Sequence, residues 1–181
     1  MAILKVARLG HPVLRRECRD LTPAEIRSAE SASLVADMRA TMAEYGGVGL
    51  AAPQVHESIR LALIEFAPDG ERYAVDEAQP LLVVFNARVT VLDEARSGFW
   101  EGCLSIPGLR GYVERPSKIR VDYLDEHASE QSMVAEGFLA TVLQHELDHL
   151  DGVLFLDRIE EPSKLAFMEE YARYHAAPAD G

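Results

Sequence analysis

Cysteines, long apolar runs and an N-terminal export signal are scarce or missing in this sequence. Its 181 residues include two cysteines, Cys18 and Cys103, which could form at most one disulfide. No apolar run approaches the roughly 20 residues that a membrane-spanning helix requires. The N-terminus lacks the order of basic, apolar and small residues found in a signal peptide. We therefore expect a cytoplasmic protein without membrane contact. An organellar location stays open, because a removed transit peptide would leave no trace.

Basic residues are also scarce, with 18 Lys and Arg against 30 Asp and Glu and a net charge of -12. A groove for a nucleic-acid backbone needs clustered Lys and Arg, so we expect no such groove. The composition, 48% hydrophobic and 27% charged, is typical of a globular protein with one core. We predict a single domain over residues 1–181, with a flexible tail from about residue 176.

Side-chain patterns predict helices near both ends of the chain and strands between them. Residues 22–25 (Thr-Pro-Ala-Glu) have the residues of a capped helix start, and an apolar stripe continues to Met42 before two glycines end the helix. Further helices are predicted over residues 136–150 and 163–175. Strand-forming residues are concentrated in residues 59–66, 81–86, 88–92 and 119–124. Strands grouped between helices indicate an α+β fold.

The strongest chemical signal is His-Glu-Leu-Asp-His at residues 145–149. On a helix, positions i and i+4 share a face, so His145 and His149 point two imidazoles at one place, with Glu146 beside them. Neither proline nor glycine interrupts residues 138–149, which supports the helix. The alternative is a surface helix that carries two histidines by chance. The pattern favours a divalent metal site.

A catalytic metal site usually has three protein ligands, so a third must come from another segment. Cys103 is the best candidate, because a thiolate binds borderline and soft metals and Gly102 permits a close approach of the backbone. Taken alone, a single cysteine is more often a buried structural residue. Cys18 lies in an arginine-rich arm without helper residues, and we interpret it as structural or exposed.

Three segments resemble the signature motifs of the peptide deformylases, in the same order and with similar spacing. They are Gly-Val-Gly-Leu-Ala-Ala-Pro-Gln at residues 47–54, Glu-Gly-Cys-Leu-Ser at 101–105 and Gln-His-Glu-Leu-Asp-His at 144–149. The similarity extends from residue 10 to about residue 158. The resemblance implies a compact α+β domain with antiparallel sheets packed around a central His-Glu-x-x-His helix. We expect the N-terminal and C-terminal helices to flank it.

The resemblance also implies an activity and its catalytic residues. The activity is removal of the formyl group from the N-terminal formylmethionine of new polypeptides, with release of formate. Cys103, His145 and His149 would bind one divalent metal, Fe²⁺ by resemblance, although Zn²⁺, Ni²⁺ and Co²⁺ also suit these ligands. A water on the metal would attack, with Glu146 as general base and acid. The Gln54 side chain and the Leu104 backbone N–H would stabilise the oxyanion.

Several residues are expected to hold the substrate, which would be an N-formylmethionyl peptide. They are Val48, Gly49, Glu101, Arg110, Phe138, Thr141 and Val142. Plain core packing is the alternative for Phe138 and Val142. Arg115 and Asp148 match the ion pair of the family, and we predict that they pair. A transient ribosome contact is a further expectation, but the segment after Glu161 is not basic enough to dock electrostatically.

Two other functions compete with a deformylase. A zinc endopeptidase shares His-Glu-x-x-His but typically has a third histidine or an acid as its last ligand, which Cys103 and Gln54 argue against. A metal-stabilised binding protein without turnover has no use for a base such as Glu146 beside an open metal position.

Overall fold

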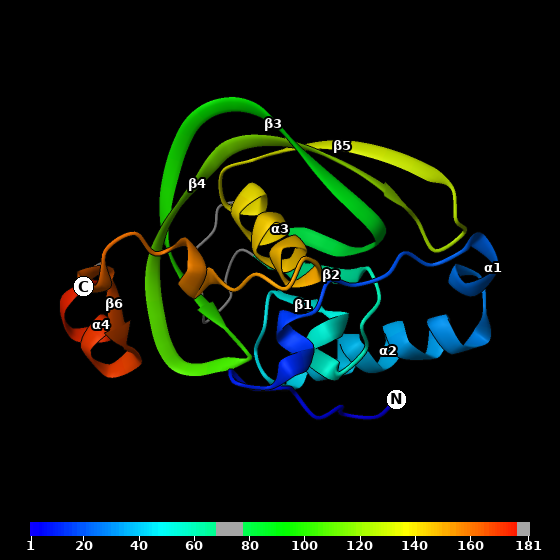
Figure 1. Cartoon of the computed structure of the whole chain (residues 1–181), viewed down its shortest axis with the longest axis horizontal. Coiled ribbons are helices and arrows are strands. Elements are labelled where there is room, and N and C mark those ends of the chain that lie inside the picture. The colour runs from blue at the N-terminus through cyan, green and yellow to red at the C-terminus, as the bar shows by residue number, and fades with distance from the viewer. Residues whose placement is uncertain (68–77, 177–181) are drawn as a thin grey trace.

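A strongly bent antiparallel sheet wraps around one helix, α3 (Gly137–Leu150), in the computed structural model, which describes residues 1–67 and 78–176 (Figure 1). The sheet is six-stranded and runs in the order β1-β2-β3-β4-β5, with β6 paired to β4. All ladders between these strands are antiparallel. The strands are β1 (Gly49–Ala51), β2 (Leu61–Phe66), β3 (Gln79–Cys103), β4 (Ile106–Leu124), β5 (Glu130–Glu136) and β6 (Leu165–Phe167).

Three further α-helices lie outside this sheet among the described residues, and the predicted α+β class is confirmed. They are α1 (Pro23–Ile26), α2 (Ala29–Glu44) and α4 (Met168–Tyr174). The strands form one continuous sheet, where the resemblance implied several. Figure 1 shows β3 and β4 curving around α3, while α1 and α2 lie on the side of the molecule where the N-terminus is marked.

Strand β2 shows how the sheet is held between α2 and α3. Its side chains alternate, as a pleated strand requires. Leu61 and Leu63 join the apolar cluster that contains Met38 of α2, whereas Ala62 and Ile64 join the cluster that contains the apolar face of α3. All four β2 side chains are fully buried. Helix α3, which carries the His-Glu-x-x-His motif, is therefore enclosed and cannot shift without disrupting the core.

The predicted N-terminal helix is two helices, so its predicted continuity was wrong. The capping box of Thr22 and Glu25 forms as expected, but α1 ends at Ile26. Ser28 then caps a new helix, because its side chain accepts a hydrogen bond from the Ser31 backbone N–H. Because Ser28 caps the start of α2, the chain can change direction between α1 and α2.

Strand β3 is much longer than the two short strands predicted for it. The interruption between residues 86 and 88 is a bulge, with Asn86 at φ 52°, and pairing with β4 resumes at Arg88. The remainder of β3 up to Cys103 pairs with β4, and β5 pairs with the other edge of β4. Both stretches were missed by the sequence prediction.

The predicted C-terminal helix over residues 163–175 begins later than expected. Residues Leu165–Phe167 form β6 instead, and α4 starts at Met168. Backbone pairing of Leu165 with Gly111 of β4 stabilises the extended form. The predicted flexibility of the tail falls mostly on residues 177–181, which lie outside the described residues.

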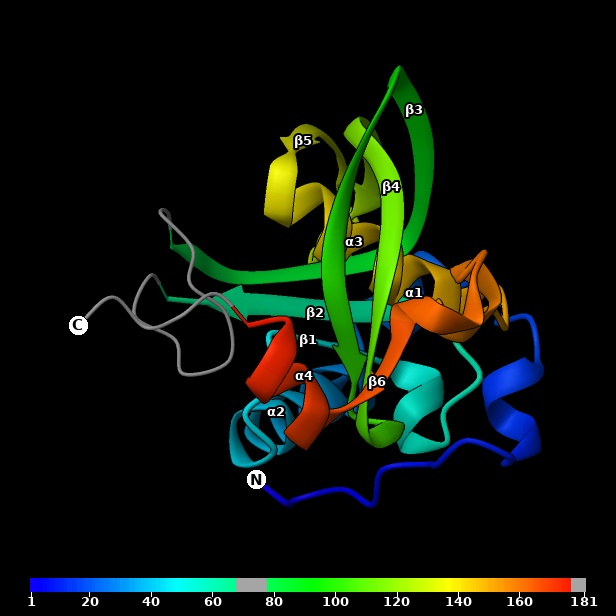
Figure 2. The same cartoon turned by 90° about the vertical axis from the view of Figure 1, so that its left-hand side faces the viewer.

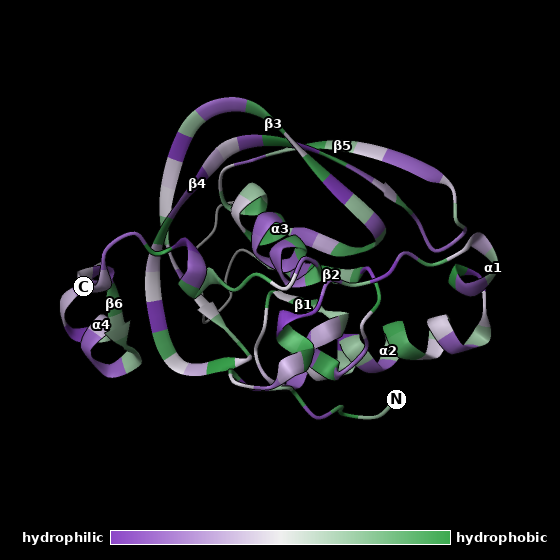
Figure 3. Cartoon of the chain, viewed as in Figure 1, coloured by the Kyte–Doolittle hydropathy of each residue, from purple (hydrophilic) through white to green (hydrophobic). Residues whose placement is uncertain are grey.

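Apolar and polar residues alternate along the strands and helices without a long apolar stretch (Figure 3). No helix in the described part of the chain has the length and apolar character needed to cross a membrane.

Candidate metal centre and active site

Cys103, His145 and His149 converge on one buried point, as the sequence predicted. Their ligand atoms all lie within 4.8 Å of one another. Cys103 ends β3, and the two histidines are one turn apart on α3, with ring centroids 5.1 Å apart. The Cys103 Sγ lies 3.3 Å from the His149 Nε2. Three groups from two distant segments thus form a sulfur–nitrogen–nitrogen set.

Glu101 determines which nitrogen of His145 faces this point. Its Oε2 lies 2.7 Å from the His145 Nδ1, so the Nε2 is directed toward Cys103. On His149, the Nε2 faces the sulfur, and the buried Nδ1 has no hydrogen-bond partner among the described residues. Both imidazoles therefore present the same ring nitrogen to the thiol, which is the arrangement that a shared cation requires.

The protonation states in this cluster favour a thiolate. Burial raises the pKa of the Cys103 thiol, but the charge of His149 and hydrogen bonds from both histidines outweigh it and hold the pKa well below its usual value. Burial lowers the pKa of His145, yet hydrogen bonds to Cys103 and Glu101 raise it well above its usual value. A thiolate with two imidazoles is a donor set for zinc, ferrous iron, nickel or cobalt, in which a cation takes the place of the shared proton.

Glu146 lies next to this set and is buried. Its Oε2 has no hydrogen-bond partner among the described residues. Burial is the main cause of a raised pKa for this carboxyl, partly offset by the two neighbouring histidines. A carboxyl whose pKa is raised in this way is suited to take up and return a proton.

Gly49 makes room for the Glu146 carboxyl. A Cβ added to Gly49 would lie 2.7 Å from both Cγ and Cδ of Glu146, closer than atoms of this kind approach. Gly49 was predicted to bind substrate. The structure places it against Glu146 on β1, where only a glycine leaves the carboxylate in position.

The Gln54 side chain is held in one orientation. The Ala51 backbone N–H donates to its Oε1 at 2.8 Å, so its NH₂ group faces the Cys103 Sγ at 3.4 Å and the Ser105 Oγ at 3.3 Å. The residue is only 1% exposed. A small hollow lined by Gly49, Gln54, Leu104 and Glu146 connects these groups with the metal ligands.

An apolar pocket opens beside the hollow. Five of the predicted substrate residues line it, namely Val48, Glu101, Phe138, Thr141 and Val142. Phe99 and Trp100 also line it, and neither was predicted to belong to the site. The part of β3 that carries both residues was not predicted. Its pairing with β4 is the signal that would have placed them at the pocket. The Phe138 ring packs edge-on against Phe66 and Phe99 at centroid distances of 5.3 and 5.9 Å.

Two of the predicted substrate residues also have other contacts. Glu101 borders the pocket, but its carboxylate is bonded to Arg115 and His145. Arg110 packs behind Gly102, where a Cβ on the glycine would lie 2.9 Å from the arginine Nη1. Their roles in substrate binding stay predictions.

A buried ion-pair network ties the helix to the hairpin. Arg115 on β4 donates to Glu101 at 2.6 Å and to Asp148 of α3 at 2.8 Å, which confirms the predicted pairing of Arg115 with Asp148. The side chains of Arg115 and Glu101 are each 5% exposed. Buried charges of this kind persist only when they are paired.

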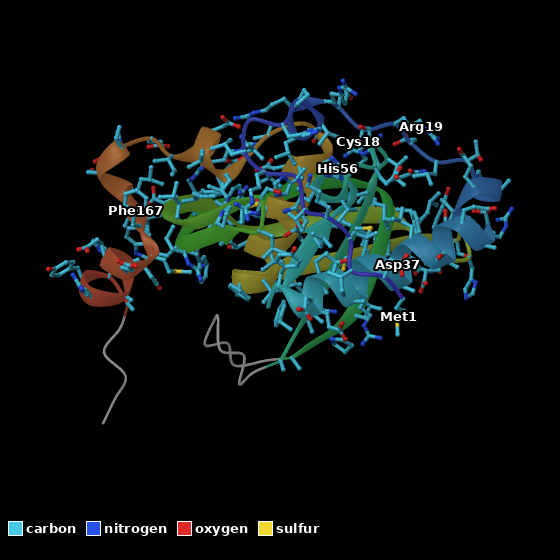
Figure 4. All side chains as sticks on the ribbon, turned by 90° about the horizontal axis from the view of Figure 1, so that it is seen from below. Met1, Cys18, Arg19, Asp37, His56 and Phe167 are labelled. Atoms are coloured by element: carbon cyan, nitrogen blue, oxygen red, sulfur yellow. The ribbon has the colours of Figure 1, made fainter. Side chains whose placement is uncertain are left out.

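Cys18 takes no part in the cluster. It lies on the N-terminal arm (Figure 4), is 5% exposed, and its backbone N–H donates to the Leu150 carbonyl at 2.8 Å. Burial raises the pKa of its thiol to about 11. Its interpretation as a structural residue agrees with this environment.

Comparison with known proteins agrees with this geometry. The sequence model described as Polypeptide deformylase matches residues 3–165. The chain belongs to the peptide deformylase family. A peptide deformylase of Leptospira biflexa serovar Patoc is 43% identical over 170 residues, which are 94% of this chain and 95% of that protein. A peptide deformylase of Rhizobium meliloti is 44% identical over 161 residues, 89% and 87% of the two chains.

A solved structure extends the comparison to three dimensions. The class I type b peptide deformylase from Acinetobacter baumannii, bound to Met-Ala-Ser, matches with a TM-score of 0.84 at 36% identity. The match covers 87% of this chain and 99% of that chain. The deformylase family is metal-dependent, and the Cys103, His145 and His149 set is the place in this member that suits a metal.

Replacing Gly49 by alanine should displace the Glu146 carboxylate of this deformylase and lower kcat by about 100-fold, since a misplacement of about 1 Å has effects of this size. Metal content should not change, because no ligand moves. The matched control is Gly47→Ala, whose Cβ would meet the flexible Leu104 side chain at 3.0 Å and should leave kcat close to that of the parent. Full activity in a metal-loaded Gly49→Ala protein would contradict this role.

Replacing Arg115 by methionine should remove the partner that buried Glu101 and Asp148 share, which leaves Asp148 with the half-exposed Arg158 and Glu101 with His145. We expect a loss of about 3–5 kcal/mol in the free energy of unfolding and a metal affinity about 10–100-fold lower. Urea unfolding and competition with a chelator measure the two effects. Arg120→Met is the control, because it breaks the half-exposed pair with Asp122 at 3.0 Å and should cost less than about 1 kcal/mol. Equal losses in both variants would show that the buried network is not required.

Proposed function

We propose that this chain removes the formyl group from N-terminal formylmethionine of new polypeptides and releases formate. The observation that carries the proposal is the convergence of Cys103, His145 and His149 beside the buried Glu146. Membership of the peptide deformylase family and the names of its relatives support it.

Glu146 acts as the proton carrier in this proposal. Cys103, His145 and His149 would hold a divalent cation, and its chemistry would be that of a Lewis acid that lowers the pKa of a water molecule and polarises the formyl carbonyl. The Glu146 carboxylate accepts the proton as the water attacks and then delivers it to the leaving amine. Its burial favours both steps, because a carboxyl with a raised pKa binds the proton well enough to accept it and remains able to donate it.

Gln54 and Leu104 stabilise the negative charge that develops on the formyl oxygen. The Gln54 NH₂ group is already turned toward the metal ligands by the bond from Ala51, so no reorganisation is needed during the reaction. The Leu104 backbone N–H follows Cys103 directly and is fixed with it. Loss of one such donor typically costs ~3 kcal/mol of transition-state stabilisation.

The apolar pocket takes the methionine side chain. Val48, Phe138, Thr141 and Val142 give it an apolar lining that accepts a flexible thioether. The backbone of β1 near Gly49 supplies an edge along which an extended peptide can lie. The structure of the Acinetobacter baumannii relative bound to Met-Ala-Ser supports a methionyl peptide as the substrate class.

Ferrous iron is the metal that we propose for this site. The set of one thiolate and two imidazoles also accepts zinc, nickel and cobalt, so the ligands alone do not decide. The choice follows the resemblance to deformylases, and it implies sensitivity to oxygen because both the metal and its thiolate can oxidise.

The proposed place of action is the cytoplasm, where formylated chains emerge from bacterial ribosomes, and the bacterial relatives support this. Helix α4 carries Glu169 and Glu170 against Arg173. A transient ribosome contact would therefore not rest on a positive charge of this helix.

Two alternatives remain weaker. A zinc endopeptidase gains no support, because the thiolate and the fixed Gln54 amide fit the deformylase set. A binding protein without turnover does not account for a buried carboxylate with an unbonded oxygen beside the metal ligands.

A Glu146→Gln variant should keep its metal but release formate about 10²–10⁴ times more slowly, because the amide cannot carry a proton. The assay is formate release from formyl-Met-Ala-Ser by anaerobically prepared protein, with metal content measured on the same samples. If metal-loaded parent protein released no formate, the deformylase proposal would fail. Cleavage of an internal peptide bond would favour an endopeptidase.

Exposure to air should inactivate the ferrous protein while protein reloaded with nickel or cobalt keeps its activity. The physical reason is oxidation of the iron and of the Cys103 thiolate. Activity and metal content are followed over time, and mass spectrometry detects oxygen added to Cys103. Ferrous protein that stays active in air, or anaerobic protein that contains only zinc at full activity, would contradict the iron proposal.

A further inference from the structure

The chain continues past the end of the family match at residue 165 and returns to the substrate pocket. Strand β6 pairs with β4, placing Ala166 opposite Arg110, and α4 follows directly. Figure 2 shows β6 alongside the ends of β3 and β4, with α4 next to it. Both β3 and β4 carry residues of the site in this region, so the C-terminal segment lies against its outer wall.

Trp100 is the first contact between α4 and the pocket. It is one of the residues that line the pocket. Its ring lies 5.3 Å from the Tyr171 ring and 4.6 Å from the His175 ring, measured between centroids. The wall of the pocket is thus supported from behind by two rings of the C-terminal segment.

Arg110 is the second contact. This buried side chain is 3% exposed, its Nε donates to the Met168 Sδ at 3.4 Å, and its guanidinium lies 5.6 Å from the centroid of the Tyr171 ring. It also donates from Nη1 to the Trp100 carbonyl at 3.4 Å. Because Gly102 leaves no space between its own backbone and Arg110, a shift of the guanidinium would be transmitted to the strand that ends at the metal ligand.

Helix α4 and the pocket wall depend on each other. The helix has seven residues and no buried side chain of its own, so it is too short to be stable without these contacts. In return, Met168 and Tyr171 cover Arg110. We propose that Tyr171 and Met168 hold Trp100 and Arg110 in place, and that the C-terminal segment thereby sets the width of the methionine pocket. Tyr171 is a positioning residue here, and the inference rests on the proposed deformylase function.

The single tryptophan of the chain makes this testable, because Trp100 is the only source of tryptophan fluorescence. Tyr171→Ala should shift the emission to longer wavelength by exposing the Trp100 ring. It should raise the KM for formyl-Met-Ala-Ser about fivefold with kcat nearly unchanged, as expected when binding is lost equally in the ground state and the transition state. The Kd of the product Met-Ala-Ser, measured by Trp100 fluorescence, should rise by a similar factor.

Two control variants isolate the role of Tyr171. Tyr171→Phe keeps the ring and should keep the parent KM. Tyr174→Ala removes a tyrosine of the same helix that is 72% exposed and should change neither emission nor KM. The preference for formylmethionyl over formylphenylalanyl peptides should fall in Tyr171→Ala alone, because a looser pocket accepts a larger side chain.

The outcomes separate the inference from the function on which it rests. An emission shift in Tyr171→Ala without a change in KM, Kd or preference would overturn the inference, as would an equal KM rise in Tyr174→Ala. If Tyr171→Ala does not fold, Met168→Ala must still raise KM, and an unchanged KM would overturn the inference. Failure of the deformylase function itself would appear as parent protein that binds metal and releases no formate.

Discussion

The pairing of buried Arg115 with Glu101 and Asp148 is the interaction on which the site depends. It joins β3, β4 and α3, the three elements that carry the ligands or border them. The same Glu101 carboxylate fixes His145 through its Nδ1. Because a shift would separate the buried guanidinium from both carboxylates, the network opposes movement of the hairpin along the helix. The distance between Cys103 and the two histidines is therefore fixed by charged side chains that are not metal ligands themselves.

The same enclosure shapes the chemistry. Burial favours the neutral form of Glu146 and opposes ionisation of Cys103, yet the two groups shift in opposite directions. The thiol faces two imidazoles, while one oxygen of the carboxylate has no hydrogen-bond partner among the described residues. One small volume thus contains a stable thiolate for binding and a proton-accepting carboxyl for turnover. The difference comes from hydrogen bonding, because both groups are buried but only the thiol is hydrogen-bonded to the imidazoles.

Features that depend on neighbouring residues could be predicted from the sequence, whereas features that depend on pairing between distant strands could not. The spacing of His145 and His149 is enough to place two ligands on one face of a helix. Cys103 was a candidate from its chemistry, and the resemblance of three motifs assigned it as the third ligand. The length of β3 could not be read from side chains, since residues 93–96 are exposed and three of the four are charged, while pairing of Asp93 and Arg96 with β4 continues the strand. The bulge at Asn86 made one strand look like two. Likewise, Leu165 fits the apolar stripe of a helix, but its backbone pairs with Gly111 of β4 and forms a strand.

Catalysis and substrate fit are supported by parts of the fold that differ in stability. The metal ligands and Glu146 lie on elements enclosed by two apolar clusters, so their positions are tied to global unfolding. Trp100 and Arg110 are backed by a helix without a buried residue, which can loosen without opening the core. A change in the C-terminal segment would then alter the fit of the substrate without altering proton transfer by Glu146. This division follows from the difference in burial between the elements that carry the metal ligands and the helix that backs the pocket.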